Sequence, residues 1–436
     1  MKNIAIVTYG CSLNSADSEI IASQIDKTNF KIVDDESKSD IVIINTCTVK
    51  GPTDTKIKRH IKRLKKEDKK VILSGCFVQA QPEIVKEKYN VSAIGTKQFS
   101  KINHILNSNE KKIIYTKTNY EIPEKNYRFD SFREIVPISR GCLGKCTYCI
   151  TKFARGKLDS REPEKIISQI KKAINEGIKE IWITAEDNFI YGLDKDYSIY
   201  SLLKKIDEID GEFFTRIGMA NPKAYKIRKE EIIKSLHLIK NSDKFYNFLH
   251  LPIQSANNRV LKIMERGYKF EEIDDFFKLS KELDFTISTD IICGFPTETD
   301  EEFQDSIDFI KYLKPDFLNI SRYWPRPKTK ALKLKHNGRI TKKRSRKLTE
   351  VYNRLAQDMN DKWIGKETRV LLNDKKSNAI VARNIEYKPV VIKNKELIDK
   401  GYNPNEMLGR FIKVKIDYST KDYLNGKIIE KNKYVD

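Results

Sequence analysis

The first hundred residues alternate short apolar runs with helical segments, and this alternation limits the possible fold more than any other feature of the chain. Apolar, β-prone runs at Ile4–Thr8, Ile41–Asn45 and Val71–Ser74 are followed by helical patterns near Ser15–Lys27, Thr53–Lys66 and Pro82–Lys88. Repeated strand–helix units predict a parallel, doubly wound sheet, because a parallel strand reaches its neighbour through a crossover helix.

One cysteine follows each of these three strands. Cys11, Cys47 and Cys76 lie one to three residues past the predicted strand ends. The carboxyl ends of parallel strands share one edge of the sheet, where ligands bind, so we expect these distant thiols to converge. Chance placement of three buried thiols is the alternative, since free cysteine is common in protein cores. We favour a metal cluster at this edge.

The middle of the chain repeats the alternation after a polar, linker-like stretch at 108–128. Six strands are predicted, with helices such as Pro163–Asn175 and Asp300–Tyr312 between them: Ile135–Ser139, Glu180–Thr184, Phe214–Gly218, Asn247–Leu251, Ile287–Ile292 and Phe317–Ser321. Six such units predict an open, partial barrel whose ligands lie at the carboxyl face.

A second set of three cysteines follows the first strand of this barrel. Cys142, Cys146 and Cys149 form a C-x3-C-x2-C pattern with no fourth cysteine or histidine nearby. A cubane iron–sulfur cluster normally takes four thiolates, so three would leave one iron open to a substrate. Structural zinc is the alternative, but zinc prefers a closed set of four ligands. The nearest histidines, His104 and His237, are not at zinc-finger spacing.

The charge balance indicates a polyanionic partner. The formal net charge is +22, and residues 328–362 contain 12 Lys and Arg against 3 Asp and Glu. A genome-wide preference for lysine codons would also raise the charge, but a concentrated strip is better explained by phosphate binding. Part of this strip, Thr341–Trp363, is predicted as a long helix.

The end of the chain changes character. Short predicted strands at Thr368–Leu372, Asn378–Ala382, Pro389–Ile392, Phe411–Ile416 and Gly426–Ile429 indicate a small β-barrel. We therefore divide this α/β chain into residues 1–110, 128–362 and 363–430. No apolar run approaches 18 residues, and no signal peptide is evident. With seven cysteines and no secretory context, we expect reduced thiols and a cytoplasmic location.

Several segments together resemble the radical SAM (S-adenosylmethionine) methylthiotransferases over nearly the whole chain. Tyr9–Ser15, Asn45–Val49 and Ser74–Cys76 are similar to the family's first three cysteine loops, His250–Ala256 and Asp290–Pro296 to its barrel strands, and the C-terminal part to the RNA-binding TRAM module. Thr151–Leu158 and Glu180–Asn188 resemble the archaeal and eukaryotic branch, which acts on N6-threonylcarbamoyladenosine in tRNA. One departure is Lys328, where the family usually has glycine.

The resemblance implies insertion of a methylthio group at C2 of the modified adenine, next to the anticodon. It also implies two 4Fe-4S clusters and SAM. The cluster on Cys142, Cys146 and Cys149 would bind and cleave SAM, and the cluster on Cys11, Cys47 and Cys76 would hold the sulfur. Tyr148, Glu186, Asn221, Gln254 and Gly294 are expected to contribute to cofactor binding. External electron and sulfur donors would be needed, and a monomer would suffice.

Three other functions stay open at this point. The chain could act on isopentenyladenosine in tRNA or on an aspartate of a ribosomal protein, since a basic surface suits both. It could also be a non-catalytic iron–sulfur protein that binds RNA. In the TRAM-like barrel, Arg383, Asn384 and Tyr387 are candidate RNA contacts, with ordinary surface residues as the alternative.

Overall fold

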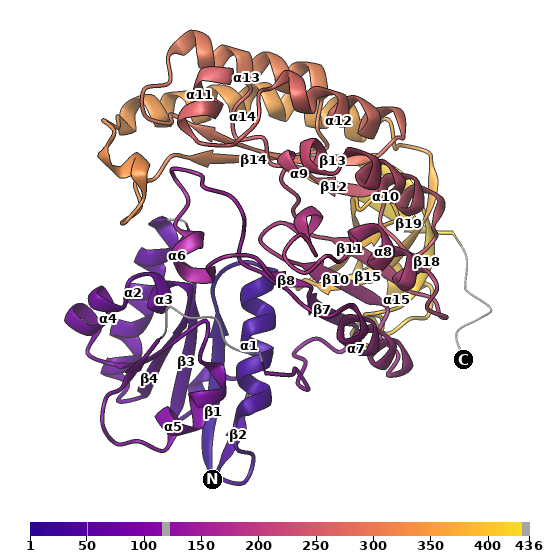
Figure 1. Cartoon of the computed structure of the whole chain (residues 1–436). Helices are drawn as coiled ribbons and strands as arrows, with labels where there is room; N and C mark the ends of the chain where they lie inside the picture. Colours follow the sequence, from indigo (N-terminus) through magenta and orange to yellow (C-terminus); the bar gives the residue numbers. More distant parts are fainter. Residues whose placement is uncertain (50, 116–122, 430–436) are drawn as a thin grey trace. The chain divides into compact units, whose positions relative to one another are not determined.

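The computed structural model describes residues 1–49, 51–115 and 123–429, which form two compact units. Unit 1 comprises Met1–Phe129, Ser139–Asp159 and Trp324–Lys333. Unit 2 comprises Asp130–Ile138, Ser160–Tyr323 and Leu334–Asp436. These two units differ from the three consecutive segments predicted from the sequence. The loop with Cys142, Cys146 and Cys149, for example, belongs to unit 1 (Figure 1).

Unit 1 is built on a six-stranded parallel sheet of order β2-β1-β3-β4-β5-β6. Its strands are β1 (Lys2–Thr8), β2 (Phe30–Ile32), β3 (Ile41–Thr46), β4 (Lys70–Gly75), β5 (Ser92–Gly95) and β6 (Ile113–Ile114). Its helices are α1 (Ser12–Gln24), α2 (Gly51–Lys66), α3 (Cys76–Ala80), α4 (Pro82–Tyr89), α5 (Ile102–Leu106) and α6 (Thr151–Arg155). The two-residue strand β8 (Ser139–Arg140) precedes the second cysteine loop, and β9 (Asp159–Ser160) begins at the last residue of this segment.

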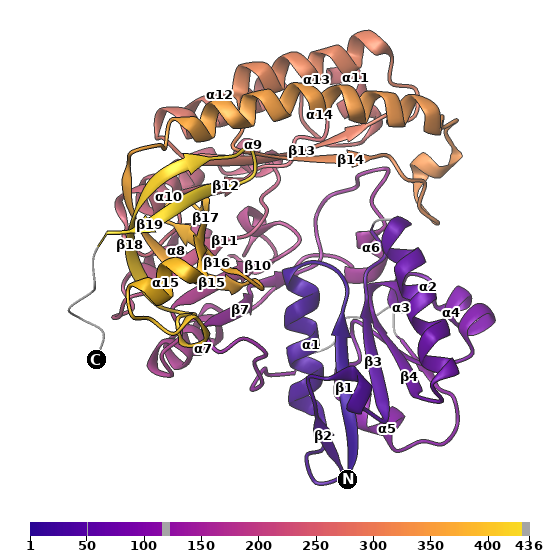
Figure 2. The ribbon, with the colours of Figure 1, turned by 180° about the vertical axis from the view of Figure 1, so that it is seen from behind.

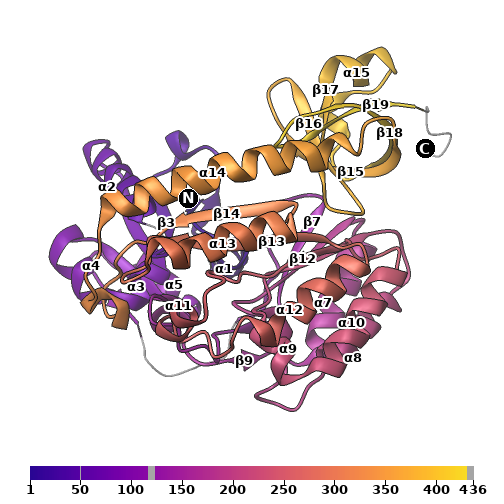
Figure 3. The ribbon, with the colours of Figure 1, turned by 90° about the horizontal axis from the view of Figure 1, so that it is seen from above.

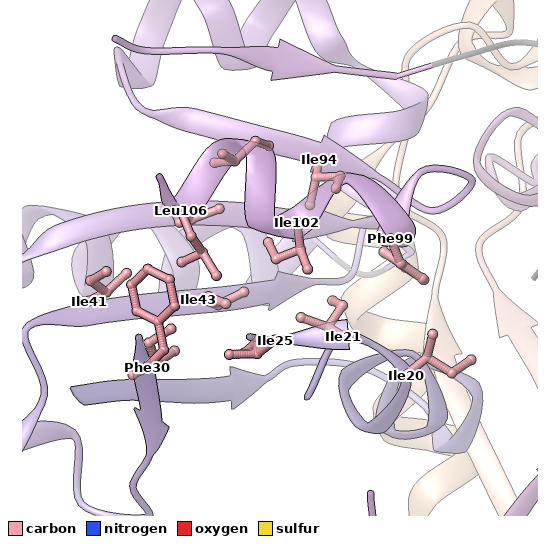
Figure 4. Packing of buried hydrophobic residues seen from close by; sticks show 13 residues of the cluster. Ile20, Ile21, Ile25, Phe30, Ile41, Ile43, Ile94, Phe99, Ile102 and Leu106 are labelled. Atoms are coloured by element: carbon pink, nitrogen blue, oxygen red, sulfur yellow. The ribbon is translucent and has the colours of Figure 1, made fainter. Parts of the chain in front are cut away.

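Alternate residues of the central strands face opposite layers of this sheet. Ile41 and Ile43 pack with α1 and α5, in a core that includes Ile20, Ile21, Ile102 and Leu106 (Figure 4). Val42 and Ile44 pack on the other face with residues of α2 and α4. Strands buried on both faces explain the continuous apolar runs in the sequence, and the predicted doubly wound sheet is confirmed.

Unit 2 contains two three-stranded parallel sheets, β7-β10-β11 and β12-β13-β14. The strands are β7 (Arg133–Pro137), β10 (Glu180–Thr184), β11 (Phe214–Ile217), β12 (Phe248–His250), β13 (Thr286–Cys293) and β14 (Phe317–Arg322). A parallel bridge between Thr215 and Phe245 links the two sheets. The six strands therefore form the open, partial barrel that the sequence predicts.

Helices connect and cover these strands: α7 (Pro163–Asn175), α8 (Ile199–Asp207), α9 (Lys223–Ile227), α10 (Lys229–Asn241), α11 (Asn258–Ile263), α12 (Glu271–Glu282) and α13 (Asp300–Leu313). The long helix α14 (Gly338–Asp361) then runs beside α13 and β14, as Figure 2 shows from behind. It starts three residues earlier than the sequence pattern indicates, because Asn337 caps it by accepting from the Arg339 and Ile340 N–H groups.

The C-terminal part of unit 2 is a closed barrel of order β15-β16-β17-β19-β18 (Figure 3). Its elements are β15 (Glu367–Lys375), β16 (Ala379–Asn384), β17 (Pro389–Lys393), α15 (Asn394–Asp399), β18 (Phe411–Ser419) and β19 (Leu424–Ile428). Apolar, mainly aromatic side chains join it to the partial barrel within unit 2: Leu371, Tyr387 and Phe411 pack with Phe214, Tyr246 and Phe248. The predicted α/β class with a small β-barrel is thus confirmed.

Candidate functional site

Three adjacent strands of the unit 1 sheet each lead directly into a cysteine. Cys11 occupies the N-cap of α1 after β1, Cys47 follows β3, and Cys76 is the first residue of α3 after β4. Strand β3 pairs with both β1 and β4, so the three cysteines share the carboxyl edge of neighbouring strands. This is the arrangement that the strand–helix pattern predicts.

The Asn14 side chain lies between two of these sulfurs. The thiols of Cys11 and Cys76 contact Asn14 Oδ1 at 3.6 and 3.7 Å. Burial raises the pKa of the Cys76 thiol to about 12, and the nearby Cys47 and Cys11 thiols add to this rise while Arg155 opposes it. The structure therefore brings Cys11, Cys47 and Cys76 together.

The second cysteine loop folds its sulfurs toward a common space. The Gly144 N–H donates to Cys142 Sγ at 3.1 Å. A Cβ atom at Gly144 would lie 3.2 Å from Cys142 Sγ and 3.8 Å from Cys146 Sγ, so any side chain there would intrude between the sulfurs. Burial and the Cys146 thiol raise the pKa of Cys149, and the Thr151 hydroxyl opposes that rise. A glycine at position 144 fits a loop that surrounds a cluster.

Both cysteine sets lie in unit 1, where the helices that adjoin them pack against each other. Helices α3 and α6 meet in a small buried cluster of Cys76, Ala80, Ile150 and Ala154. Helix α6 follows Cys149 by two residues, and α3 begins with Cys76. The same helix pair therefore carries the end of one cysteine loop and the last cysteine of the other.

A buried carboxylate on α1 anchors both ends of the second loop. Asp17 is 0% exposed. Its two carboxylate oxygens form ion pairs with the guanidinium nitrogens of Arg140 and Arg155, each at an N···O distance of 2.6 Å. Arg140 comes two residues before Cys142, and Arg155 is the last residue of α6. Arg155 also donates to Asn14 Oδ1 at 2.9 Å, which joins this network to the first cysteine set.

Sequence reasoning missed Asn14 and Asp17, although the chain carries a signal for both. They are three residues apart on α1 and so share one side of the helix. Both are buried, in a helix whose other buried residues include Leu13, Ile20 and Ile21. Polar residues on a buried helix side require partners, and both residues find one in a segment more than 120 residues away.

The segment 324–333 also belongs to unit 1. Arg326 is 4% exposed, pairs with Asp54 at 2.8 Å and donates to the Thr48 hydroxyl at 2.9 Å, next to Cys47. Lys328 has φ of +64°, a left-handed conformation that glycine adopts without strain. Lys328 therefore adopts the left-handed turn that glycine would form at this position. Its Nζ donates to the Ala80 carbonyl at 2.8 Å.

The other predicted site residues lie where the topology indicates. Glu186 follows β10, Asn221 follows β11, Gln254 follows β12 and Gly294 follows β13, all at the carboxyl ends of unit 2 strands. Tyr148 lies in the second cysteine loop of unit 1 and is half-buried. At Gly294, φ is +69° and a Cβ atom would approach Thr341 Oγ1 to 2.3 Å, so packing within the fold already requires glycine.

Asn221 is held by a buried acid that sequence reasoning overlooked. The Asn221 N–H donates to Asp187 Oδ1 at 3.0 Å, and its side-chain oxygen accepts from Arg266 at 3.1 Å. Burial raises the pKa of Asp187 to about 7, with the Asn221 N–H and Arg266 opposing the rise. The Asn221 side-chain oxygen thus has a partner within the fold.

Basic side chains are exposed on two helices. Helix α14 exposes Arg339, Lys342, Lys343, Arg346 and Lys347, whereas Arg344 is buried against Glu298 and Asp300. Helix α2 exposes Lys58, Arg59, Lys62 and Lys66. In the C-terminal barrel, by contrast, Asn384 is 0% and Tyr387 9% exposed, so neither presents a free side chain to RNA, and Arg383 stacks on Tyr387.

Two features are absent from the described residues. No group of three or more His, Cys, Asp or Glu side chains in that part of the chain has the geometry of a metal-ion site. Within the same residues, no helix combines the length and apolar character needed to cross a membrane.

Comparison with known proteins connects these features. The radical SAM superfamily model matches residues 136–310, uncharacterized protein family UPF0004 matches residues 3–95, and the TRAM domain matches residues 362–429. The solved structure of TsrM, a radical S-adenosylmethionine methyltransferase from Kitasatospora setae, is 13% identical with a TM-score of 0.57, and the match covers 76% of this chain and 74% of that one. This likeness shows a shared fold.

Two curated relatives match nearly the whole chain. A probable threonylcarbamoyladenosine tRNA methylthiotransferase of Pyrococcus abyssi is 39% identical, over 98% of this chain and 100% of its own length. The threonylcarbamoyladenosine tRNA methylthiotransferase of Homo sapiens is 34% identical, over 98% of this chain and 74% of its own. The chain therefore belongs to the radical SAM family of threonylcarbamoyladenosine tRNA methylthiotransferases.

Proposed function

We propose that the protein inserts a methylthio group at C2 of N6-threonylcarbamoyladenosine, next to the anticodon of tRNA. The observation that carries the proposal is the convergence of two sets of three cysteines within one compact unit. A non-catalytic RNA-binding protein would not need two incomplete ligand sets. The likeness to relatives named for this reaction supports the choice of substrate.

An iron–sulfur cluster and SAM follow from membership in the radical SAM family, and the second cluster is part of the proposal. Cys142, Cys146 and Cys149 would hold one cluster, and Cys11, Cys47 and Cys76 the other; each thiolate of such a cluster binds its own iron. When bound, these groups supply the one-electron and sulfur chemistry that an unactivated C–H bond requires.

The chain's own residues prepare both sets of thiolates. Cys11 lies at the N-cap of the 13-residue helix α1, whose N-terminal dipole stabilises a thiolate. The Arg155 guanidinium lies near Cys76 and counteracts the rise in its pKa that burial causes. At the second loop, the N–H groups of Thr151 and Lys152 at the start of α6 favour the thiolate of Cys149.

The proposed cofactor contacts at the barrel are Glu186, Asn221, Gln254 and Gly294, together with Tyr148 of the cysteine loop. Their support is positional: four of them follow strands of the partial barrel at its carboxyl end, where barrel enzymes bind ligands. Since the Asn221 side-chain oxygen already accepts from Arg266, its amide NH₂ is the group left to contact a cofactor.

Transfer RNA would be held by phosphate contacts from the exposed cations of α14 and by the TRAM barrel. Such binding weakens as salt rises, because counterions are released from the RNA. The target base must leave its stack to reach the catalytic groups. We place this reaction in the cytoplasm, carried out by a monomer that depends on external electron and sulfur donors.

The first test is nucleoside mass spectrometry of tRNA from a host that lacks such an enzyme, with and without this chain. We expect the methylthio form of threonylcarbamoyladenosine to accumulate only when the chain is present. A gain on isopentenyladenosine instead would contradict the substrate assignment. No change in any tRNA nucleoside, with clusters loaded, would favour a ribosomal protein substrate.

A second test separates the roles of the two cysteine sets. Under anaerobic reduction, Cys146→Ala should abolish SAM cleavage, whereas Cys47→Ala should retain cleavage and lose sulfur insertion. Cys293→Ala is the matched control, because Cys293 is a fully buried thiol within β13 that belongs to neither set. Methylthio product from the Cys47 variant would contradict the proposed second cluster.

A further inference from the structure

The interior wall of the partial barrel in unit 2 carries an arginine in an aromatic setting. Trp182 on β10 pairs directly with Arg216 on β11, and paired residues of parallel strands point to the same face of a sheet. The alternate residues Ile181 and Ile183 are 0% exposed and form the opposite, apolar face of β10. Trp182 and Arg216 are half-buried and thus lie on the more open face.

Three aromatic rings surround the Arg216 guanidinium. Its central carbon lies 5.2 Å from the ring of Trp182, 5.6 Å from that of Phe248 and 5.4 Å from that of Tyr387. Tyr387 comes from the C-terminal barrel, which packs against the partial barrel within unit 2. The rings orient the guanidinium and lower its hydration, and both effects strengthen its attraction for an anion.

Arg216 lacks the partner that such a cation normally has. Among the described residues it makes no side-chain hydrogen bond and no ion pair, and its Nε is buried without an acceptor. The buried indole Nε1 of Trp182 also has no acceptor in that part of the chain. Each buried donor without an acceptor costs free energy until a ligand or water satisfies it.

The neighbouring Arg133 shows what a structural arginine looks like on the same wall. Its guanidinium stacks on Trp182 at 4.2 Å, but it also pairs with Glu180 at 2.5 Å and with Asp130 at 2.8 Å. The same indole therefore touches one neutralised arginine and one that is not neutralised. The difference identifies Arg216 as the cation available to a ligand.

Toward the carboxyl end of the strands, hydrogen-bonding side chains line the wall. His250 lies two residues after Phe248 on β12, so both point to the same face. His250 contacts Asp290 Oδ1 at 2.9 Å, and Asn319 donates to the same oxygen at 2.7 Å. These side chains are half-buried or exposed, so they can be reached by a ligand at the carboxyl end of the strands.

From this arrangement we infer that Arg216 binds the carboxylate of the threonylcarbamoyl group, with Trp182 Nε1 as a further donor. This inference rests on the proposed function. An adenine whose C2 faces the catalytic end would project its N6 substituent away from it, and that substituent ends in a free carboxylate. Isopentenyladenosine has a hydrocarbon substituent at N6, so a desolvated guanidinium would favour the first nucleoside and disfavour the second.

The test compares two synthetic anticodon stem–loops, one carrying threonylcarbamoyladenosine and one carrying its carboxamide. The reconstituted full-length enzyme should prefer the acid by about 10–100-fold in kcat/KM, as expected for charge-assisted hydrogen bonds. Arg216→Gln should lose this preference and process the acid about as slowly as the amide. Arg216→Lys should recover part of it.

Arg369→Gln is the matched control. Arg369 also stacks on an aromatic ring, Phe411 at 4.0 Å, but it is exposed and pairs with Glu212. We expect this variant to keep the full preference. Thermal unfolding of each variant identifies any loss of fold, and the comparison of acid with amide in the unmodified enzyme needs no substitution at all.

The methionyl carboxylate of SAM is the other carboxylate available. If Arg216→Gln weakened SAM binding or RNA-independent SAM cleavage as much as it slowed RNA modification, Arg216 would bind SAM and the inference would be overturned. Equal rates on acid and amide by the unmodified enzyme would also overturn it. Failure to modify either stem–loop, with SAM cleavage intact, would instead contradict the proposed function.

Discussion

Arginines serve different purposes in the two units. In unit 1, Arg140 and Arg155 share the carboxylate of Asp17, and Arg155 also donates to Asn14. In unit 2, Arg216 contacts three aromatic rings and no carboxylate among the described residues. A guanidinium neutralised within the fold holds segments together, whereas one surrounded by rings but left without an anion is prepared to bind one.

The largest effect is expected at Asp17. Asp17→Asn would remove the buried charge that pairs with both Arg140 and Arg155, which costs about 3–5 kcal/mol of stability. Because Arg140 and Arg155 flank the second cysteine loop, cluster content should fall together with stability. The measurements are the apparent midpoint of anaerobic guanidinium unfolding and the iron content of the purified protein.

A double-mutant cycle with Arg155→Gln tests whether Asp17 acts through this pair. We expect strong coupling, so that the double variant is less damaged than the two single losses added together. Asp308→Asn is the control, since Asp308 pairs with Lys311 on the surface of α13 and should leave both measurements unchanged. Additive losses at Asp17 and Arg155 would show that the network does not act as a unit.

A smaller effect is expected at Asp187, a buried acid in unit 2. Its pKa in the folded protein is raised by burial from 3.8 to about 7. A raised pKa means that the folded state binds the proton more tightly than the unfolded chain does. The stability this provides is complete below pH about 4 and is lost as pH rises through about 7.

Asp187→Asn should remove this pH dependence, because asparagine keeps an acceptor for the Asn221 N–H and does not ionise. Relative to the variant, the unmodified protein should lose roughly 2–4 kcal/mol between pH 4 and pH 8. Unfolding midpoints measured across this range test the expectation. Parallel curves for the two proteins would show that Asp187 does not titrate there.

The sequence predicted most of the architecture because its signals are local. Strand–helix alternation, cysteine positions and apolar periodicity identified the parallel sheet, the partial barrel and the convergence of Cys11, Cys47 and Cys76. The short strands β2, β5 and β6 of the same sheet were missed, because two to four residues carry too little pattern. The C-terminal strands were predicted because turn residues separate them.

Long-range polar partners could not be predicted in the same way. Asp17 meets Arg140 across 123 positions, and no local pattern specifies such a pair. The position of the second cysteine loop in unit 1 depends on these contacts and on the α3–α6 packing. The isolation of Arg216 depends on which carboxylates fail to reach it, which only the folded chain reveals.

The smallest effect is expected at Lys328, where the backbone conformation matters more than the side-chain charge. Lys328 has φ of +64°, which is unfavourable for a residue with a Cβ atom, and its Nζ donates to Ala80 O. Lys328→Gly should relieve the strain but lose the hydrogen bond, for a net change of less than about 1 kcal/mol. Lys328→Ala keeps the strain and loses the bond, so it should be the less stable of the two variants by about 1 kcal/mol. Unfolding midpoints of both variants, measured beside the unmodified protein, test this order, and an alanine variant as stable as the glycine variant would show that the left-handed turn carries no strain.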